Sequence, residues 1–337
     1  MEKKKIVFFA TPVKEKNYLK KKLKKKNYEL EFYADSLTEE NAELVKGADA
    51  ISVFIYSRVS KKVLQNGDKL KLIATRSTGF NHIDLDEAKK KNITVANVPY
   101  YGENTVAEHT FALILALSRN LHKAYVRTLQ SNFSLEGLRG FDLKNKTLGV
   151  IGAGSIGVHV MKMAKGFGMK VIAFDVNRNH ILEELLDFNY VTFDELLANS
   201  DIISMHAPYN KHTHHLINMD NIGKVKRGAL FINTARSGLI QPDALYYAID
   251  KGIFGGAGLD VFEGEDLMND ENQMLTKNVP VENLEAVLKR NLLMRRENVI
   301  ITPHMAFDSV EAVERILDTT AENIECFFSE KNYYKVV

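Results

Sequence analysis

The sequence predicts an α/β protein with two domains, each built around a parallel β-sheet. The first observation is that short apolar, β-branched runs alternate with amphipathic stretches along almost the whole chain, which is typical of parallel strands joined by helical crossovers. The second is the length, because 337 residues suit two domains of roughly 100–200 residues each. The third is a long apolar, helix-like segment that separates two series of expected strands.

Those two series of strands define the predicted domains. The first series occupies residues 5–10, 29–34, 50–56 and 71–77, and the second occupies 146–152, 170–175, 201–208, 228–235, 256–262 and 298–304. A helix is expected over 309–328, after the last strand, and we expect it to pack back onto the first series. The predicted domains are therefore a discontinuous one, residues 1–101 with 305–337, and an inserted one, residues 102–304.

Composition excludes several classes of protein. The chain is 45% hydrophobic and 26% charged, which is ordinary for a globular protein. No apolar run approaches the roughly 18 residues of a membrane span, and the run before Thr11 is too short for the core of a secretory signal. Cys326 is the only cysteine, so no intrachain disulfide can form. We expect a cytoplasmic protein without a membrane partner.

The positive charge is concentrated at the amino terminus. The net charge is +2, yet the first 26 residues carry eleven lysines against two glutamates. Such an arm is compatible with nucleic-acid binding, but no nucleic-acid-reading motif accompanies it. Tyr18, Leu19 and Leu23 recur at helical spacing, which predicts an amphipathic helix over 14–26 with its lysines in solvent. We therefore expect no nucleic-acid partner.

The segment between the two series is predicted to be a long helix over 104–122. It begins with Asn104-Thr105, as a capped helix does, and its apolar residues continue nearly all round the helix. Such a helix should be buried. Its burial is expected either between the domains or against another subunit.

A glycine motif opens the second domain. Gly152, Gly154 and Gly157 form G-x-G-x-x-G directly after an expected strand and before a helical stretch, and the next strand ends at Asp175. In dinucleotide-binding folds the first glycine makes a tight turn, the second lets the pyrophosphate approach the backbone, and the third lets helix and strand pack closely. A glycine turn without a ligand is the alternative, but strand, helix and acidic residue coincide here.

The acidic residue indicates which dinucleotide is bound. Asp175 lies 18 residues after Gly157, near the roughly 20 expected for the carboxylate that accepts hydrogen bonds from the ribose hydroxyls. That carboxylate would repel a 2′-phosphate, so NAD is predicted over NADP. Arg178 could bind such a phosphate, and NADP use stays open on that account.

Chemically active side chains follow three later strands of the second series. Arg236 follows 228–235, Glu263 and Glu265 follow 256–262, and His304 ends the last strand. Ligands of open α/β sheets bind at the carboxyl ends of the strands. An arginine can hold a carboxylate in a bidentate contact, and a histidine beside a carboxylate can give a proton to a developing alkoxide. With hydride from NADH, this set would reduce a 2-oxo acid to a 2-hydroxy acid.

Over nearly its whole length the chain resembles the D-isomer-specific 2-hydroxyacid dehydrogenases. The matching stretches are TRSTGFNHID (75–84), VPYYGENTVAEHTFALILALSR (98–119), LGVIGAGSIG (148–157), DIISMHAPYNKHTHHLIN (201–218), GALFINTARSGLI (228–240), GAGLDVFEGE (256–265) and NVIITPHMAF (298–307). The resemblance implies two Rossmann- or flavodoxin-like domains with an intervening cleft, NAD in the second domain, a small 2-oxo or 2-hydroxy acid as substrate, and a homodimer formed through the long helix.

The resemblance also implies roles for individual residues. Arg236 is expected to bind substrate, Glu265 to support the histidine, and His304 to be the acid/base; no metal is expected. The backbone amides of Ser77, Thr78 and Gly79 would hold the substrate carboxylate. The expected cofactor-binding positions are Gly152, Gly154, Ser155, Ile156, Gly157, Asp175, His206, Ala207, Pro208, Thr213, Thr234, Ala235 and Asp260.

Within the family the sequence is most similar to the D-lactate dehydrogenase branch. The 39 residues from Glu265 to His304 include a helix-like stretch, 281–293, that resembles an insertion of that branch. Tyr101 stands where the branch has a tyrosine near the substrate, although an aromatic packed at a loop explains it equally well. Ser237 and Asp308 depart from the usual pattern. The expected reaction is reduction of pyruvate to D-lactate.

Other functions remain compatible with the sequence. The same catalytic set would serve 2-oxoisocaproate, glyoxylate or hydroxypyruvate as substrate, because the sequence does not reveal the size of the substrate pocket. The family architecture also includes NAD-sensing transcriptional corepressors, which use the fold as a ligand-gated dimer. The complete set of Arg236, Glu265 and His304 favours an enzyme over such a binding protein.

Overall fold

The computed structural model describes residues 3–24, 27–262 and 291–337. The chain divides into two compact units, unit 1 with Met1–Tyr101 and Ser309–Val337, and unit 2 with Gly102–Asp308. The chain thus returns from unit 2 to unit 1 after Asp308, whereas the sequence suggests that this boundary lies between residues 304 and 305. The intervening residues stay with unit 2 because the backbone N–H groups of Met305 and Ala306 donate hydrogen bonds to the Asp260 carboxylate.

Unit 1 contains a five-stranded, fully parallel sheet in the order β2-β1-β3-β4-β5, the order of flavodoxin-like folds. The strands are β1 (Lys4–Phe8), β2 (Tyr28–Phe32), β3 (Ala50–Val53), β4 (Leu72–Thr75) and β5 (Thr94–Ala96). The first four confirm the expected strands. The three-residue β5 lies outside the expected strands.

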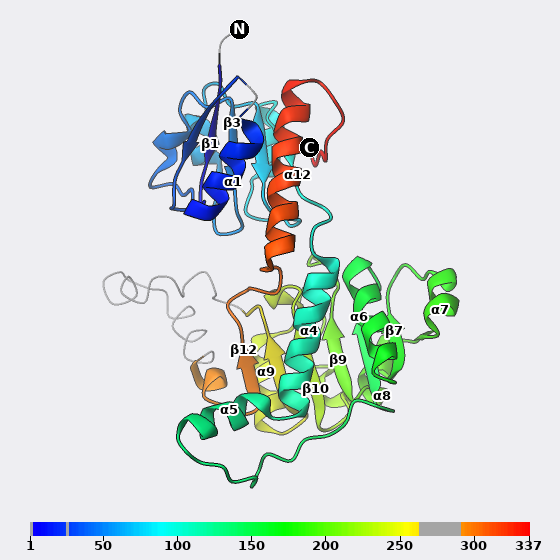
Figure 1. Ribbon diagram of the computed structural model, residues 1–337. Coiled ribbons are helices and arrows are strands. Elements are labelled where there is room, and N and C mark those ends of the chain that lie inside the picture. Colours follow the sequence, from blue (N-terminus) through cyan, green and yellow to red (C-terminus); the bar gives the residue numbers. More distant parts are fainter. Residues whose placement is uncertain (1–2, 25–26, 263–290) are drawn as a thin grey trace. The chain divides into compact units, whose positions relative to one another are not determined.

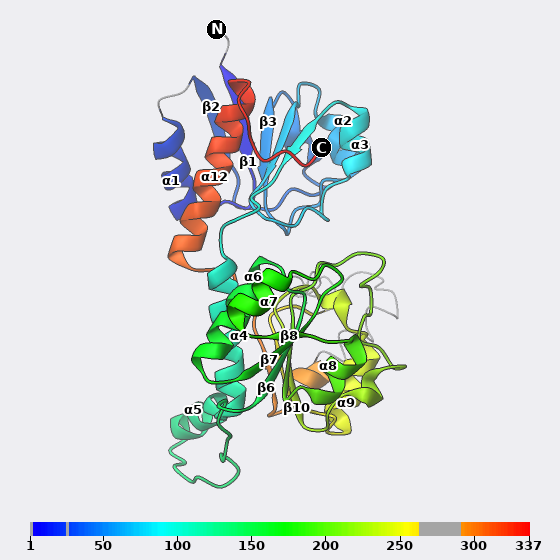
Figure 2. The same cartoon turned by 90° about the vertical axis from the view of Figure 1, so that its right-hand side faces the viewer.

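Helices cover both faces of the unit 1 sheet (Figure 2). One face packs against α1 (Val13–Leu23) and α12 (Val310–Phe328), and the other against α2 (Lys61–Asn66) and α3 (Leu85–Lys90), near the 3-10 helix η1 (Ala42–Val45). The expected return of the carboxyl-terminal helix to this unit is confirmed. Asp318 of α12 accepts a hydrogen bond from Tyr18 of α1 (2.8 Å) and pairs with Lys22 (2.7 Å).

The amphipathic character predicted for the lysine-rich segment is also confirmed. In α1, Leu19 and Leu23 are fully buried, whereas Lys20, Lys21 and Lys22 are exposed. The two leucines pack in the same apolar cluster as strand and α12 residues, so the hydrophobic face of α1 attaches the helix to the sheet.

Unit 2 contains a seven-stranded parallel sheet in the order β12-β11-β10-β9-β6-β7-β8. Counted from β6 this is the Rossmann order, and the order reverses between β6 and β9. The strands are β6 (Thr147–Ile151), β7 (Lys170–Phe174), β8 (Asn189–Tyr190), β9 (Ile202–Met205), β10 (Ala229–Asn233), β11 (Phe254–Leu259) and β12 (Val299–Ile301). Only the two-residue β8 lies outside the expected set.

Two helix layers enclose the unit 2 sheet (Figure 2). Apolar side chains of α4 and α6 fill one face, and those of α8 and α9 fill the other. The helices are α4 (Glu103–Ser118), α5 (Leu121–Leu129), α6 (Ser155–Gly166), α7 (His180–Leu186), α8 (Phe193–Asn199) and α9 (Pro242–Asp250), with 3-10 turns η2 (Ile222–Lys224) and η3 (Ser237–Leu239).

The helix expected over 104–122 is shorter than predicted. The expected burial is confirmed, but its place differs from both expected ones, because α4 packs within unit 2. The helix also ends at Ser118, and a separate helix, α5, follows (Figure 1). Asn120 adopts a left-handed conformation (φ +50°) and its side-chain amide donates to the Arg139 carbonyl (3.2 Å). The Phe141 N–H donates to the Ser118 carbonyl (2.9 Å), so a returning loop takes the place of the next helical turn.

Some of the expected features lie outside the described residues. Glu263, Glu265 and most of the 281–293 segment belong to this group. In the described part of the chain, no helix has the length and apolarity needed to cross a membrane. The same residues contain no cluster of three or more histidine, cysteine or acidic side chains that could hold a metal ion.

Candidate functional site

The candidate residues of unit 2 lie along the carboxyl edge of its sheet. Backbone hydrogen bonds join the strand ends there: His206 N–H donates to Ile151 (2.7 Å), Asp260 N–H to Asn233 (2.9 Å), and His304 N–H to Asp260 (3.0 Å). Residues far apart in the sequence are therefore held on one edge, where ligands of open α/β sheets bind.

The glycine motif connects β6 to α6, and its glycines have different surroundings. Gly152 has φ +99°, and a Cβ built on it would lie 2.6 Å from the Ala207 nitrogen. A Cβ on Gly157 would lie 2.1 Å from the Gly152 carbonyl oxygen, whereas a Cβ on Gly154 would meet no atom within 4 Å. The first and third glycines are thus required for packing, and the second leaves the backbone open to a ligand.

The loop fits the pyrophosphate of a dinucleotide. The twelve-residue helix α6 begins at Ser155, so the amino-terminal N–H groups and partial positive charge of a helix lie beside the open Gly154. Ser155 is exposed, and Ile156 packs against the apolar cluster under the loop. These positions agree with an anion bound by backbone amides.

Asp175 follows β7 and faces the same loop. Its carboxylate accepts hydrogen bonds from the N–H groups of Ala153 (2.7 Å) and Asn177 (2.8 Å), which fixes its orientation beside the glycine turn. The Arg178 guanidinium lies over the Tyr190 ring, 5.9 Å from its centroid. Arg178 thus stacks on β8.

The segment after β9 carries four of the expected positions. Ala207 abuts Gly152, and Pro208 is exposed. The Thr213 hydroxyl donates to the Pro208 carbonyl (2.6 Å) and accepts from the Asn210 N–H (2.8 Å), so Thr213 shapes its own turn. Burial lowers the pKa of His206 to about 3, and its Nε2 contacts the Ser204 hydroxyl (2.7 Å). His206 is therefore neutral near pH 7.

Arg236 stands just beyond β10 on a backbone that a buried asparagine holds. The Asn233 side chain donates to the Arg236 carbonyl (2.9 Å) and accepts from the Ala235 N–H (3.0 Å). Arg236 is half-buried and its Nη1 donates to the Ala235 carbonyl (2.7 Å). Asn233 was not among the predicted site residues, although an amide at the end of an otherwise apolar strand is a usable signal in the sequence.

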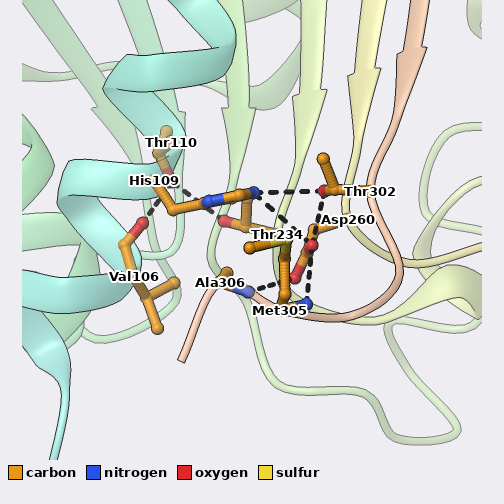
Figure 3. Close-up of polar contacts among 8 residues, drawn as sticks. All are labelled: Val106, His109, Thr110, Thr234, Asp260, Thr302, Met305 and Ala306. Atoms are coloured by element: carbon orange, nitrogen blue, oxygen red, sulfur yellow. Dashed lines mark hydrogen bonds and ion pairs between the residues drawn. The ribbon is translucent and has the colours of Figure 1, made fainter. Parts of the chain in front are cut away.

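Asp260, at the end of β11, is fully buried and supports the loop after β12 (Figure 3). Its carboxylate accepts hydrogen bonds from the Thr302 hydroxyl (2.5 Å) and from the N–H groups of Met305 (2.9 Å) and Ala306 (2.8 Å). Burial alone would raise the pKa of Asp260, but hydrogen bonds from its partners outweigh it and the pKa lies below the usual value. Asp260 is therefore a carboxylate.

His304 occupies the centre of the loop that Asp260 holds. Its φ of +51° is left-handed, which is costly for a residue with a side chain. Its N–H donates to the carbonyls of Asp260 (3.0 Å) and Thr302 (2.9 Å). The surrounding hydrogen bonds thus fix this residue in a conformation that it would rarely adopt alone.

The predicted carboxylate-binding loop of unit 1 follows β4. Its polar groups bond inward: the Ser77 hydroxyl donates to Gly79 O (2.6 Å), the Thr78 hydroxyl to Val98 O (2.8 Å), and the Asn97 amide to Thr78 O (2.8 Å). Among the residues that the structure describes, none accepts a hydrogen bond from the N–H groups of Ser77, Thr78 or Gly79. Three successive donors are therefore available to an anion.

A buried arginine that the sequence analysis missed anchors this loop. Arg76 is 2% exposed, and its guanidinium donates to Phe9 O (2.7 Å), Ala10 O (2.8 Å) and the Ser52 hydroxyl (3.0 Å). Burial lowers the pKa of Arg76 to about 10, so it stays charged near pH 7. In the sequence, Arg76 could have been noticed as a charged residue directly after the largely apolar strand β4. Tyr101, half-buried, ends the first segment of unit 1.

Comparison with known proteins identifies the family. The sequence profile of the D-isomer specific 2-hydroxyacid dehydrogenase, NAD binding domain, matches residues 111–306. A D-lactate dehydrogenase of Escherichia coli (strain K12) is 38% identical over 323 residues, 95% of each chain. The chain belongs to the D-isomer-specific 2-hydroxyacid dehydrogenase family. It is therefore an NAD-dependent oxidoreductase that acts on the CH–OH group of 2-hydroxy acids.

Two further relatives bear on the substrate. The structure of a D-lactate dehydrogenase from Aquifex aeolicus, complexed with NAD and lactic acid, matches with a TM-score of 0.86 and 39% identity over 96% of each chain. An aromatic 2-oxoacid reductase of Clostridium sporogenes is 37% identical over 309 residues, 90% of each chain. Enzymes with different substrates are thus similarly close in sequence.

Proposed function

We propose that the protein is a D-lactate dehydrogenase that reduces pyruvate with NADH. The observation that carries this proposal is the set of carboxylate-binding and proton-donating groups. They are the three backbone N–H groups at 77–79, which donate to no residue that the structure describes, the Arg236 guanidinium, and an imidazole at position 304. The close likeness to D-lactate dehydrogenases over nearly the full chain supports pyruvate as the 2-oxo acid.

Recognition of the substrate carboxylate is assigned to two groups. The N–H groups of the 77–79 loop are oriented by the inward hydrogen bonds of that loop. Arg236 offers a planar guanidinium, which binds a carboxylate through two parallel hydrogen bonds and polarises a nearby carbonyl. Tyr101 is proposed to line the substrate side of unit 1.

His304 is assigned the role of acid/base. In the direction of reduction its protonated ring gives a proton to the carbonyl oxygen of the substrate; in the reverse direction the neutral ring takes that proton back. Bound NADH supplies the hydride. Glu265 is proposed to support the His304 imidazole.

The cofactor is proposed to bind along the edge formed by the ends of β6, β7, β9, β10 and β11. The open backbone at Gly154 and the start of α6 would hold the pyrophosphate, and Asp175 would accept hydrogen bonds from the adenosine ribose. The remaining positions assigned to cofactor contacts are Gly152, Ser155, Ile156, Gly157, His206, Ala207, Pro208, Thr213, Thr234, Ala235 and Asp260.

We further propose that the enzyme is a homodimer formed through α5 and the segment after it. Six large apolar side chains are exposed between residues 121 and 135: Leu121, Tyr125, Val126, Leu129, Phe133 and Leu135. We call this set the α5 patch. Several large apolar side chains exposed within one short segment are typical of an interaction site, and a second copy offers the same segment for a two-fold contact. The α4 helix itself packs within unit 2.

The role of His304 is tested with His304→Ala and His304→Asn. Asparagine tolerates the left-handed backbone that this position requires, so it separates loss of the ring from loss of the loop conformation. Both variants should reduce turnover of pyruvate by about 10²–10⁴-fold, the usual contribution of a general acid, and should bind NADH as the unaltered enzyme does. Steady-state kinetics and fluorescence titration with NADH measure the two effects.

Two outcomes would count against this assignment. Loss of NADH binding in both variants would move His304 into the cofactor site. Turnover close to that of the unaltered enzyme in His304→Asn would remove the imidazole from the reaction.

A further inference from the structure

One turn of α4 contacts the ends of two strands that carry candidate catalytic residues (Figure 3). His109 projects toward the end of β12, where its Nε2 lies 3.1 Å from the Thr302 hydroxyl and 3.5 Å from a carboxylate oxygen of Asp260. The adjacent Thr110 contacts Thr234, just after β10, with 2.9 Å between the two hydroxyl oxygens. His109 and Thr302 are half-buried, and Asp260, Thr110 and Thr234 are buried.

The direction of the first chain of hydrogen bonds follows from counting protons. Thr302 has one hydroxyl proton and donates it to Asp260 (2.5 Å). Its oxygen therefore accepts from His109, which requires the proton of His109 on Nε2. The chain runs from His109 through Thr302 to the Asp260 carboxylate.

Asp260 connects this chain of hydrogen bonds to His304, the candidate acid/base residue. Its carboxylate accepts the N–H groups of Met305 and Ala306, and its carbonyl accepts the N–H of His304. The left-handed backbone of His304 is thus fixed on both sides by one residue, whose own orientation depends on Thr302 and His109.

The second chain leads to the candidate substrate-binding arginine. The Thr110 hydroxyl donates to the Val106 carbonyl of the same helix (2.8 Å), so its oxygen accepts the proton of Thr234. Thr234 lies two residues before Arg236 and is 8% exposed. One helix therefore holds the backbone that presents Arg236 and the loop that presents His304.

We propose that His109 and Thr110 are positioning residues, which set the placement of His304 and Arg236 relative to each other through α4. They act through Thr302, Asp260 and Thr234. The inference rests on the proposed roles of His304 and Arg236. Its chemical reason is that proton transfer and carboxylate binding must occur on one small substrate, so a displacement of either group by about 1 Å lowers the rate steeply.

The experiment compares His109→Leu with His109→Gln. The leucine removes the donor to Thr302, whereas the glutamine amide can reach the position of the imidazole Nε2–H and donate in its place. We expect His109→Leu to lower kcat for the fastest 2-oxo acid by about tenfold or more, with the dissociation constant for NADH within twofold. His109→Gln should recover most of that kcat. His159→Leu, on α6, is the matched control and should leave kcat unchanged.

A double-mutant cycle tests whether His109 acts through Thr302. In a Thr302→Val background the further change His109→Leu should cost clearly less than it does in the unaltered enzyme, because the link through Thr302 is already broken and only the direct contact of His109 with Asp260 (3.5 Å) is left to lose. Thr302→Val by itself also interrupts the series of hydrogen bonds from His109 to Asp260. The test therefore does not depend on whether His109→Leu folds. Thr110→Val should raise the KM for the 2-oxo acid more than it lowers kcat, and Thr110→Ser should not.

The outcomes separate this inference from the function on which it rests. If His304→Asn loses activity while His109→Leu keeps kcat within twofold, the positioning role is wrong and the proposed function stands. If both His109 variants lose activity equally with a lower unfolding temperature, the histidine is merely structural and the inference is overturned. Retained turnover in His304→Asn would instead refute the proposed function.

Discussion

Two glycines of one loop have opposite physical requirements. Gly157 is buried under the turn, where a Cβ would lie 2.1 Å from the Gly152 carbonyl oxygen, and neither backbone can move aside cheaply. Gly154 is exposed, and a Cβ there would meet no protein atom within 4 Å. Gly157 is therefore required by the fold, and Gly154 leaves space for the ligand that the loop is proposed to bind.

This difference predicts distinct effects of the same substitution. Gly157→Ala should lower the unfolding temperature by several degrees, because the methyl group overlaps a backbone carbonyl. Gly154→Ala should unfold within about one degree of the unaltered protein but bind NADH roughly tenfold more weakly, since the methyl group occupies the approach to the backbone amides. Thermal unfolding and NADH titration measure the pair; weakened binding in neither variant would contradict the assignment of the loop.

At the residue scale, strand ends were predictable and side-chain networks were not. Gly152, Asp175, Arg236 and His304 could be found because a motif or a strand boundary marks each of them in the sequence. The partners that orient them come from distant segments: Asp260 reaches the loop after β12, and His109 reaches it from α4. Such pairings depend on the packing of whole elements, which spacing along the chain does not encode.

At the element scale, long β-branched runs identified strands correctly, and short or irregular elements escaped. The strands β5 and β8 have three and two residues and few apolar ones, so no strand pattern emerges. The equally short β12 was found because all three of its residues are apolar and β-branched. The end of α4 was missed for another reason. Apolar residues continue past Ser118, so periodicity favoured a longer helix, but a left-handed Asn120 and the loop that bonds to the helix end stop it.

The break after α4 can be tested at Asn120. Asn120→Ala places a Cβ without a polar partner in a left-handed conformation, at a cost of roughly 1–2 kcal/mol, and removes the donor to the Arg139 carbonyl. Asn120→Gly loses the same donor but relieves the backbone. We expect the alanine variant to have the lower unfolding temperature, by about 2–4 °C per kcal/mol of difference. An alanine variant as stable as the glycine variant would show that the turn is not constrained.

At the scale of the whole molecule, two units with different strand orders each bury their own core. Unit 1 has the flavodoxin-like order and unit 2 the Rossmann order, and α12 completes unit 1 from the far end of the chain. The alternation of strands and helices predicted both sheets. It could not predict that the α5 patch would remain exposed, because apolar residues in sequence are equally typical of a core.

The α5 patch predicts the oligomeric state. Leu129→Glu introduces a charge into the proposed two-fold contact, where it would meet its own copy or an apolar surface. The unaltered protein should have about twice the mass of the 38.1 kDa chain in analytical ultracentrifugation, and Leu129→Glu should shift toward the monomer. Leu185→Glu, an equally exposed leucine on α7, is the control. A dimer in all three proteins would place the interface elsewhere.

The most direct test of the proposed function follows NADH oxidation with pyruvate, 2-oxobutyrate, 2-oxoisocaproate, glyoxylate and hydroxypyruvate, and determines the chirality of the product. A D-lactate dehydrogenase should reduce pyruvate fastest and should form D-lactate. Faster reduction of a larger or hydroxylated acid would contradict pyruvate as the substrate, and formation of L-lactate would contradict the assigned stereochemistry.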